Sequence, residues 1–215
     1  HSCRMTLQMN NSADLWIMPT PQGVLHAFSE AQPDALQLAL QKLLSTDHAL
    51  PLELWSNGIT ESDTLLAKAR EKHWVHFLRR PVTGPDIRLN DFAQHVIAPL
   101  SGERRAVLAS DSGFCLGHAG VHQDEADALS VAAADFSGYA RRQSERGWNG
   151  AQRYVSFFSD PNLLMPDWSF IPFWVDGSGY WLIVGGEPLL NTLAMVELVW
   201  SIRLAANRFV PAAAN

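Results

Sequence analysis

The chain has 215 residues, 47% of them hydrophobic, and a formal net charge of −6 at pH 7 with a pI near 5.7. This length and apolar content suffice for one or two domains with hydrophobic cores. The acidic balance excludes a general affinity for nucleic acid or for anionic membranes. Two cysteines, Cys3 and Cys115, are too few for a disulfide framework, which indicates a cytoplasmic protein. No apolar run approaches the roughly 18 residues of a transmembrane helix, so no membrane span is expected.

The first 85 residues predict a small α+β unit. The expected elements in chain order are a hairpin over 15–29 with Gly23 in its turn, helices over 33–44, 52–57 and 60–72, and a strand over 74–78. Three helices followed by a strand is the order of a winged helix. Residues 79–86 contain two prolines and a glycine, which marks a linker or wing. We therefore predict a winged-helix-like domain over 1–85 and a second domain over 86–215.

The second unit begins with a short helix that Asn90 or Asp91 caps and Pro99 ends. The elements expected after it are a hairpin over 104–120 that turns at Asp111-Ser112-Gly113, a helix over 124–146, strands over 153–158, 169–175 and 180–185, and a last helix over 191–207. Acidic residues begin the long helix and arginines end it, and both placements complement the helix dipole. The pattern predicts an α/β fold with a five-stranded antiparallel sheet, one long helix and flanking helices.

This order over residues 90–207 resembles a Roadblock/dynein-light-chain domain. The residues that carry the resemblance are Arg105–Gly120, the acidic helix start at Asp124, and Asn191–Leu204. The family pattern has an apolar strand, an Asp-x-Gly type turn, a small-residue second strand and an acidic-led helix rich in Ala and Leu. The resemblance covers about 55% of the chain and implies a non-catalytic homodimer. Its partner would be a small Ras-like GTPase or another protein of a larger complex.

The expected dimer interface combines the long helix with the strand that follows it. Small residues recur at four-residue spacing along the helix, so a second helix could approach closely, although the same ridge could pack on its own sheet. An apolar strand left at a sheet edge is an aggregation hazard unless it is paired. The predicted interface residues are Ser130, Ala134, Gly138, Tyr154, Phe157 and Phe158.

Three patterns that could carry chemistry have simpler explanations. Cys115 is expected to face away from His118 along an extended strand, so they would not form a nucleophile and base. Ser112 lacks the flanking glycines of a serine nucleophile motif, and a hairpin turn explains it. His73 and His76 have no third ligand cluster, and no Gly-rich phosphate loop is present. We therefore predict no enzyme activity, no metal and no cofactor.

Two other functions remain open. DNA binding through helix 60–72 would need positive charge, but residues 1–85 carry 7 Lys and Arg against 8 Asp and Glu, so nucleic acid is not the expected partner. A ligand-sensing pocket, or a partner surface, could form from the aromatic residues late in the chain, because aromatics line pockets as well as cores and interfaces. The candidates are Trp168, Phe170, Phe173, Trp174 and Trp181.

Overall fold

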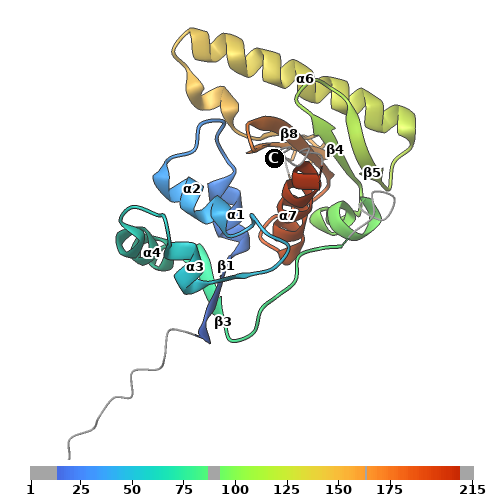
Figure 1. Cartoon of the computed structure of the whole chain (residues 1–215). Coiled ribbons are helices and arrows are strands. Elements are labelled where there is room, and N and C mark those ends of the chain that lie inside the picture. Colours follow the sequence, from blue (N-terminus) through green and yellow to red (C-terminus); the bar gives the residue numbers. More distant parts are fainter. Residues whose placement is uncertain (1–13, 87–92, 163, 209–215) are drawn as a thin grey trace, which may run out of the picture.

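The computed structural model describes residues 14–86, 93–162 and 164–208, which form two antiparallel sheets with helices packed around them (Figure 1). The smaller sheet has the strand order β2-β1-β3, and the larger has the order β5-β4-β8-β7-β6. The five-stranded antiparallel sheet expected from the sequence is therefore confirmed.

The smaller sheet belongs to the N-terminal unit. Its elements are β1 (Trp16–Pro19), α1 (Pro21–Ala27), α2 (Ala35–Lys42), β2 (Leu50–Pro51), α3 (Leu52–Ser56), α4 (Ser62–Glu71) and β3 (Val75–Leu78). The three predicted helices and the strand after them are present as α2, α3, α4 and β3. The winged-helix assignment of this unit stays a prediction, as does the domain boundary at residue 85.

The hairpin predicted over residues 15–29 is wrong, because helix α1 follows directly after β1. The Thr20 hydroxyl accepts a hydrogen bond from the Gly23 amide at 3.0 Å, and Pro21 occupies the first helical turn. Thr at the N-cap and Pro just after it are strong helix-start signals. The same residue types also favour turns, which explains the error.

The second unit contains the larger sheet. Its elements are a π-helical turn η2 (Ala93–Ile97), the 3-10 turns η3 (Ala98–Leu100) and η4 (Asn149–Gln152), the strands β4 (Ala106–Ser110), β5 (Cys115–Ala119), β6 (Val155–Phe157), β7 (Trp168–Val175) and β8 (Ser178–Gly185), and the helices α6 (Gln123–Glu145) and α7 (Leu193–Arg208). The predicted order of helix, two strands, long helix, three strands and helix is confirmed. The caps proposed at Asn90 and Asp91 lie outside the described residues.

The larger sheet is covered on both faces. Helix α6 lies across one face, over a core that includes Val107, Phe170 and Trp181 (Figure 1). On the other face, Leu108, Ile171 and alternating neighbours join a larger core, to which α7, η2 and the N-terminal unit also contribute. The strands alternate between these two cores, as period-two geometry requires.

Helix α7 connects the two units. The Trp200 indole nitrogen donates to the Thr46 carbonyl at 2.7 Å, and the Arg203 guanidinium donates to the Gln41 carbonyl. The buried residues of this shared core run from Ile17 to Leu204. The N-terminal unit therefore packs on the same face of the large sheet as α7.

Candidate functional site

The inner face of α6 consists of small side chains. Ala126, Ser130, Ala133 and Ala140 are buried, with spacings of four, three and seven residues. Small residues at these positions let the helix lie close to β4 and β8. The larger Phe136 packs beside them, against Phe170 and Trp181.

The sequence periodicity predicts a sheet-facing stripe of Leu129, Ala132, Ala133, Phe136, Tyr139 and Ala140, and all of these except Tyr139 pack toward the sheet. Ser130, expected on the outer ridge, is 0% exposed, and its hydroxyl donates to the Ala126 carbonyl at 2.7 Å. Ala134 lies beside Gly113 in the β4–β5 turn, and Gly138 is partly exposed. Tyr139, expected on the sheet side, is exposed. Of the three predicted interface residues on the helix, Ser130 is thus covered by its own chain.

On the outer face of α6, acidic and basic side chains gather at opposite ends of the helix. Acidic side chains lie exposed at its N-terminal end and basic side chains at and just beyond its C-terminal end. The acidic group is Asp124, Glu125 and Asp127, and the basic group is Arg141, Arg142 and Arg146. Between them Val131 is 57% exposed and Tyr139 is 44% exposed. This face therefore carries net opposite charge at its two ends, with the exposed Asp135 beside the two apolar side chains in its centre and Glu145 among the arginines.

Strand β6 is an edge of the larger sheet. It pairs with β7, with Val155 opposite Phe170 and Phe157 opposite Trp168. Tyr154 is 61% exposed, Phe157 46% and Phe158 40%. Phe136 of α6 stacks on Phe157 with ring centroids 5.7 Å apart, so the middle of the helix lies above this edge. The predicted interface residues of β6 and its flanks are thus brought together with the middle of α6.

The five predicted aromatic residues do not share one pocket. Phe170 and Trp181 are buried under α6, whereas Phe173 lies on the opposite face and stacks on Tyr180. Trp168 lies under the Arg105 guanidinium, with 4.6 Å from Cζ to the ring centroid. The Trp181 indole nitrogen donates to Ser137 at 2.8 Å, which ties β8 to α6. These aromatics therefore serve mainly as core.

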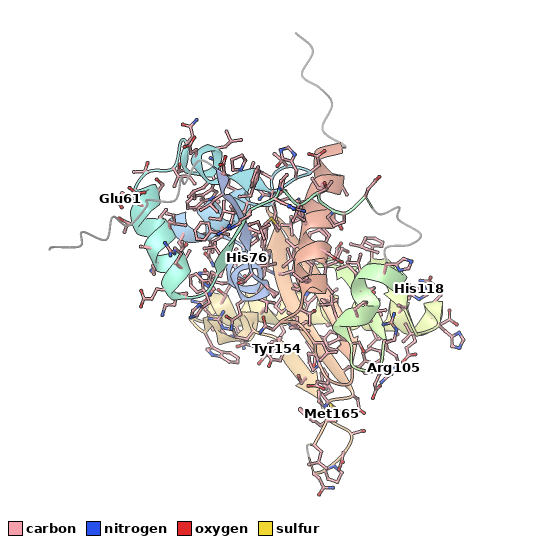
Figure 2. The ribbon with its side chains drawn as sticks, turned by 90° about the horizontal axis from the view of Figure 1, so that it is seen from below. Glu61, His76, Arg105, His118, Tyr154 and Met165 are labelled. Atoms are coloured by element: carbon pink, nitrogen blue, oxygen red, sulfur yellow. The ribbon has the colours of Figure 1, made fainter. Side chains whose placement is uncertain are left out.

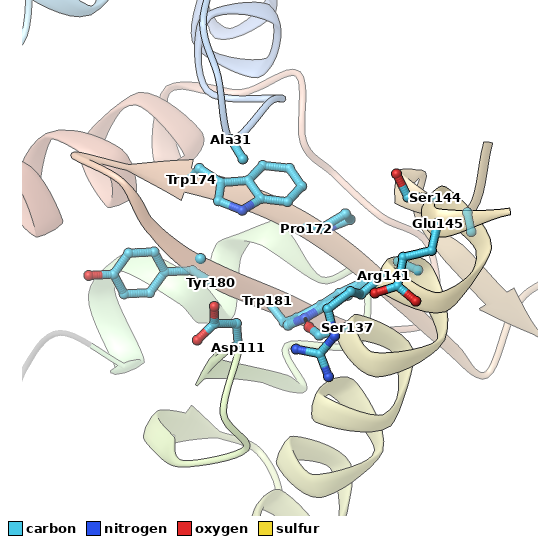
Figure 3. A pocket seen from close by; sticks show the side chains of 13 residues that line it. Ala31, Asp111, Ser137, Arg141, Ser144, Glu145, Pro172, Trp174, Tyr180 and Trp181 are labelled. Atoms are coloured by element: carbon cyan, nitrogen blue, oxygen red, sulfur yellow. Dashed lines mark hydrogen bonds between the residues drawn. The ribbon is translucent and has the colours of Figure 1, made fainter. Parts of the chain in front are cut away.

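One cavity does contain two of the predicted aromatics. It has a volume of about 430 Å³ and lies between the C-terminal half of α6 and the β7–β8 hairpin (Figure 3). Pro172, Trp174 and Trp181 contribute from the hairpin, and small residues such as Ala140 contribute from the helix. Asp111, Arg141 and Glu145 supply its charged groups.

A second, smaller groove was not foreseen from the sequence. It has a volume of about 270 Å³ and lies between α1 and β7. The residues lining it are Val24, Leu25, Phe28, Ser29, Arg153, Tyr154, Ile171, Pro172, Phe173, Leu190 and Met195. Figure 2 shows Tyr154 against the ribbon near the middle of the molecule, whereas Met165 lies out on the β6–β7 connection. Recognising α1 from the Thr20-Pro21 signal would have placed an apolar helical face here.

The candidate nucleophile and base of β5 bond to other groups. The Cys115 thiol lies 3.7 Å from the Gly117 carbonyl, while the two His118 ring nitrogens contact the Val121 carbonyl and the Gln123 amide oxygen. The expectation that Cys115 and His118 face opposite ways is wrong. A β-bulge pairs Cys115 with Ala109 and His118 with Val107, and both of these β4 residues point toward α6.

Four side chains among the described residues have a pKa that is shifted from its ordinary value. Burial lowers the pKa of His26, which stacks on Trp74 at a centroid distance of 3.8 Å, and burial also lowers the pKa of His76. Hydrogen bonds from Ser159 lower the pKa of Asp167, and burial raises the pKa of Tyr180. These four groups do not form one cluster with a shared catalytic geometry.

Two properties of the described residues concern metal and membrane. Within residues 14–86, 93–162 and 164–208, no three His, Cys, Asp or Glu side chains converge in a way that could hold a metal ion. In the same part of the chain, no helix has both the length and the apolar composition needed to cross a bilayer.

Comparisons with known proteins give one structural similarity to report. No family model matches the chain, and no curated protein matches it. Among solved structures, the chain is similar to a Roadblock/LC7 domain from Streptomyces avermitilis, with 22% sequence identity and a TM-score of 0.33. That similarity covers 48% of this chain and 84% of the solved domain.

Proposed function

We propose that this protein is a non-catalytic, dimeric scaffold or regulator that self-associates through α6 and β6. The observation that carries the proposal is the exposed edge of β6 directly beside the charge-segregated outer face of α6. Exposed edges with apolar side chains tend to be paired or protected in native proteins. A two-fold partner would cover both features at once.

Two-fold symmetry makes the outer face of α6 complementary to itself. When two copies of a helix pack antiparallel, the N-terminal half of each faces the C-terminal half of the other. Asp124 and Asp127 of one copy would then approach arginines of the second copy. Such complementarity steers association and fixes the register.

The helix and the strand can share a single symmetry axis. Phe136 lies near the middle of α6 and stacks on Phe157 of β6. An axis through the middle of β6 would therefore also pass near the middle of α6. In the proposed dimer both elements would be covered together, and the exposed Val131 and Tyr139 would add apolar area to the α6 contact.

Charge reversal tests this arrangement. The variant Asp124→Arg/Asp127→Arg makes both ends of α6 basic, and Arg142→Glu/Arg146→Glu makes both ends acidic. Each variant alone should self-associate more weakly, because like charges would meet. An equimolar mixture should recover the dimer, because the basic helix then faces the acidic one. Sedimentation velocity at low salt measures the self-association of each variant and of their mixture, with the wild type as reference.

Two results would contradict the proposal. One is a wild-type chain that stays monomeric at roughly 100 µM, a concentration at which even weak dimers form. The other is a mixture of the two variants that associates no better than either variant alone.

The partner class follows from the resemblance to the Roadblock family, which implies a small Ras-like GTPase. Purified Ras-like GTPases from the same cell, loaded with GDP or a GTP analogue, test this by direct binding to the wild-type dimer. Binding that depends on the nucleotide supports GTPase regulation. Its absence with every such GTPase leaves the scaffold role with another protein partner.

A ligand-sensing role is the second candidate, and the 430 Å³ cavity favours it. This volume lies in the range of small-molecule sites. A ligand that raises the melting temperature of the wild type, but not of Trp174→Ala, would support it. The matched control is Trp148→Ala, because Trp148 is exposed and is not among the residues that line the cavity.

A further inference from the structure

We propose that the groove between α1 and β7 receives Phe158 of the partner subunit, so that the N-terminal unit forms part of the dimer interface. This inference rests on the β6 pairing proposed above and assigns an occupant to a groove outside α6 and β6. The occupant is a second copy of this chain. Four properties of the groove and of the strand lead to it.

The groove has the size and chemistry for one aromatic side chain. Its volume is about 270 Å³, and it is lined by Val24 and Leu25 of α1, by Phe28 directly after that helix, and by Ile171 and Phe173 of β7. These apolar walls favour a benzyl group over a polar side chain. A buried Phe is a large contribution to an interface, because it removes on the order of 150–250 Å² from water.

The side chains flanking β6 point toward this groove. Ser156 bonds to Ser169 at 2.8 Å, and Ser169 lies on the same face of β7 as Ile171 and Phe173. Side chains two residues apart share a face of a strand, so Tyr154 and Phe158 lie on the groove side with Ser156. The lining of the groove includes Tyr154, which agrees with this alternation.

The register of an antiparallel pair determines which residue of the second copy arrives there. A two-fold axis through Ser156, the central residue of β6, pairs Tyr154 with the partner's Phe158. The two residues then share the groove face, since directly opposite side chains lie on the same side of a sheet. The partner's Phe158 therefore reaches the groove where Tyr154 lines it.

The groove also offers a specific contact to an aromatic ring. Arg153 lines it beside Tyr154. A guanidinium over the face of an aromatic ring is favourable, more so when it is removed from water. Phe158 is 40% exposed and Tyr154 61% exposed in the single chain, so both have surface that this contact would bury.

Disulfide trapping between two chains tests the contact directly. Both chains carry Cys3→Ser and Cys115→Ser; one also carries Leu25→Cys and the other, with a tag that changes its mass, carries Phe158→Cys. Because each chain has a single cysteine, a 25–158 disulfide must join two subunits. Mild oxidation of the mixed dimers should produce this mixed-mass species in high yield, given the short Cβ separation that a disulfide needs. The matched control replaces Leu25→Cys with Leu54→Cys, at an exposed position of α3 outside the groove.

A second variant pair measures the effect on affinity. Phe158→Ala should raise the dimer dissociation constant about 10- to 100-fold, the range for truncating an aromatic anchor. Leu54→Ala, which removes an exposed apolar side chain of α3 outside the groove and outside α6 and β6, should leave the constant unchanged.

The outcomes separate this inference from the proposed function. A dimer with an efficient 25–158 disulfide, and weakened by Phe158→Ala, supports both. The groove contact is overturned, and the dimer left intact, if the 25–158 disulfide forms in no higher yield than the control 54–158 disulfide. The same holds if Phe158→Ala leaves the dimer dissociation constant unchanged. A wild-type monomer at roughly 100 µM overturns both.

Discussion

At the scale of single residues, Gly23 illustrates how one residue type can serve two structural purposes. The sequence pattern predicts a hairpin turn at Gly23, where glycine would supply a positive φ. In the structure it lies within α1, where a Cβ atom would come within 2.0 Å of the Trp74 carbonyl oxygen. Glycine is required here because the helix contacts the backbone just before β3.

Gly23→Ala should therefore destabilise the protein, although alanine is the better helix former. A backbone atom cannot move aside as a flexible side chain can, so α1 must shift; the expected cost is about 1–3 kcal/mol, as for overpacking. Urea unfolding followed by circular dichroism measures it. The control is Gln22→Ala, exposed on the same helix, which should be close to neutral. Equal stability of the two variants would refute the close approach.

The two perturbed histidines of the N-terminal unit predict a pH dependence of stability. Burial lowers the pKa of His26 and of His76 below their ordinary value of 6.5. Protons then bind the unfolded chain more readily than the folded one. The stability is fully present above pH 6.5 and declines as the pH falls through the folded-state pKa values.

The melting temperature should accordingly drop between pH 7.5 and pH 5.5. His26→Phe keeps an aromatic ring stacked on Trp74 and removes one titrating group, so the drop should become smaller. His122→Gln, at an exposed position before α6, should leave it unchanged. A drop of the same size in all three proteins would assign the effect to other groups.

At the scale of elements, the sequence predicted most of the larger sheet correctly because its signals are local. The Asp111-Ser112-Gly113 turn has Gly113 at φ +96°, and the long helix runs over 123–145 against a predicted 124–146. The burial of Ser130 against the sheet was not predicted, because the sequence placed it on the outer ridge of the helix. Of the large residues assigned to the sheet side, Leu129 and Phe136 pack there and Tyr139 is exposed, because the close approach of helix and sheet favours alanine and serine. That distance is a tertiary property and leaves no signal in the helical period.

The β-bulge in β5 is a second feature that the sequence did not reveal. Between Leu108 and Ala109 the register with β5 shifts, so the alternation of faces expected for Cys115 and His118 does not hold. One extra residue reverses the face of each residue after it. A short strand with Gly117 inside it gives too few positions to detect such a shift from periodicity.

The observed orientation of α6 predicts which alanines tolerate a larger side chain. Ala133→Leu puts three further carbons against the sheet, where Ala133 is 0% exposed, and should destabilise by about 1–3 kcal/mol. Ala128→Leu, on the exposed face, should change the unfolding free energy by less than about 0.5 kcal/mol. Chemical denaturation of both variants tests whether Ala133 lies against the sheet and Ala128 faces away from it. If Ala128→Leu were the damaging change, the orientation of α6 would be wrong.

At the scale of the whole molecule, the two units share one hydrophobic core. The Trp174 amide donates to the Phe28 carbonyl at 3.0 Å, and Trp200 of α7 reaches Thr46. Sequence reasoning proposed a boundary at residue 85 from a Pro- and Gly-containing segment. A segment of that composition marks an irregular connection, but it does not reveal whether the flanking parts pack together. That depends on long-range contacts such as those of α7.

A shared core predicts a single cooperative unfolding transition for both units. Elements that bury the same apolar surface lose it together, so neither unit should melt alone. Calorimetry should give one peak whose calorimetric and van't Hoff enthalpies agree at protein concentrations where the chain is monomeric.

Trp200→Phe tests the coupling, because it keeps an aromatic ring in the core but leaves the Thr46 carbonyl without its donor. The lost hydrogen bond should cost about 1–3 kcal/mol. For a chain of this size, that cost lowers the melting temperature by roughly 2–12 °C. The peak should move to lower temperature and remain single, and hydrogen exchange should accelerate in β1 and β8 alike. Two separate peaks in the wild type, or faster exchange in the N-terminal unit alone, would mean that the chain folds as two independent domains.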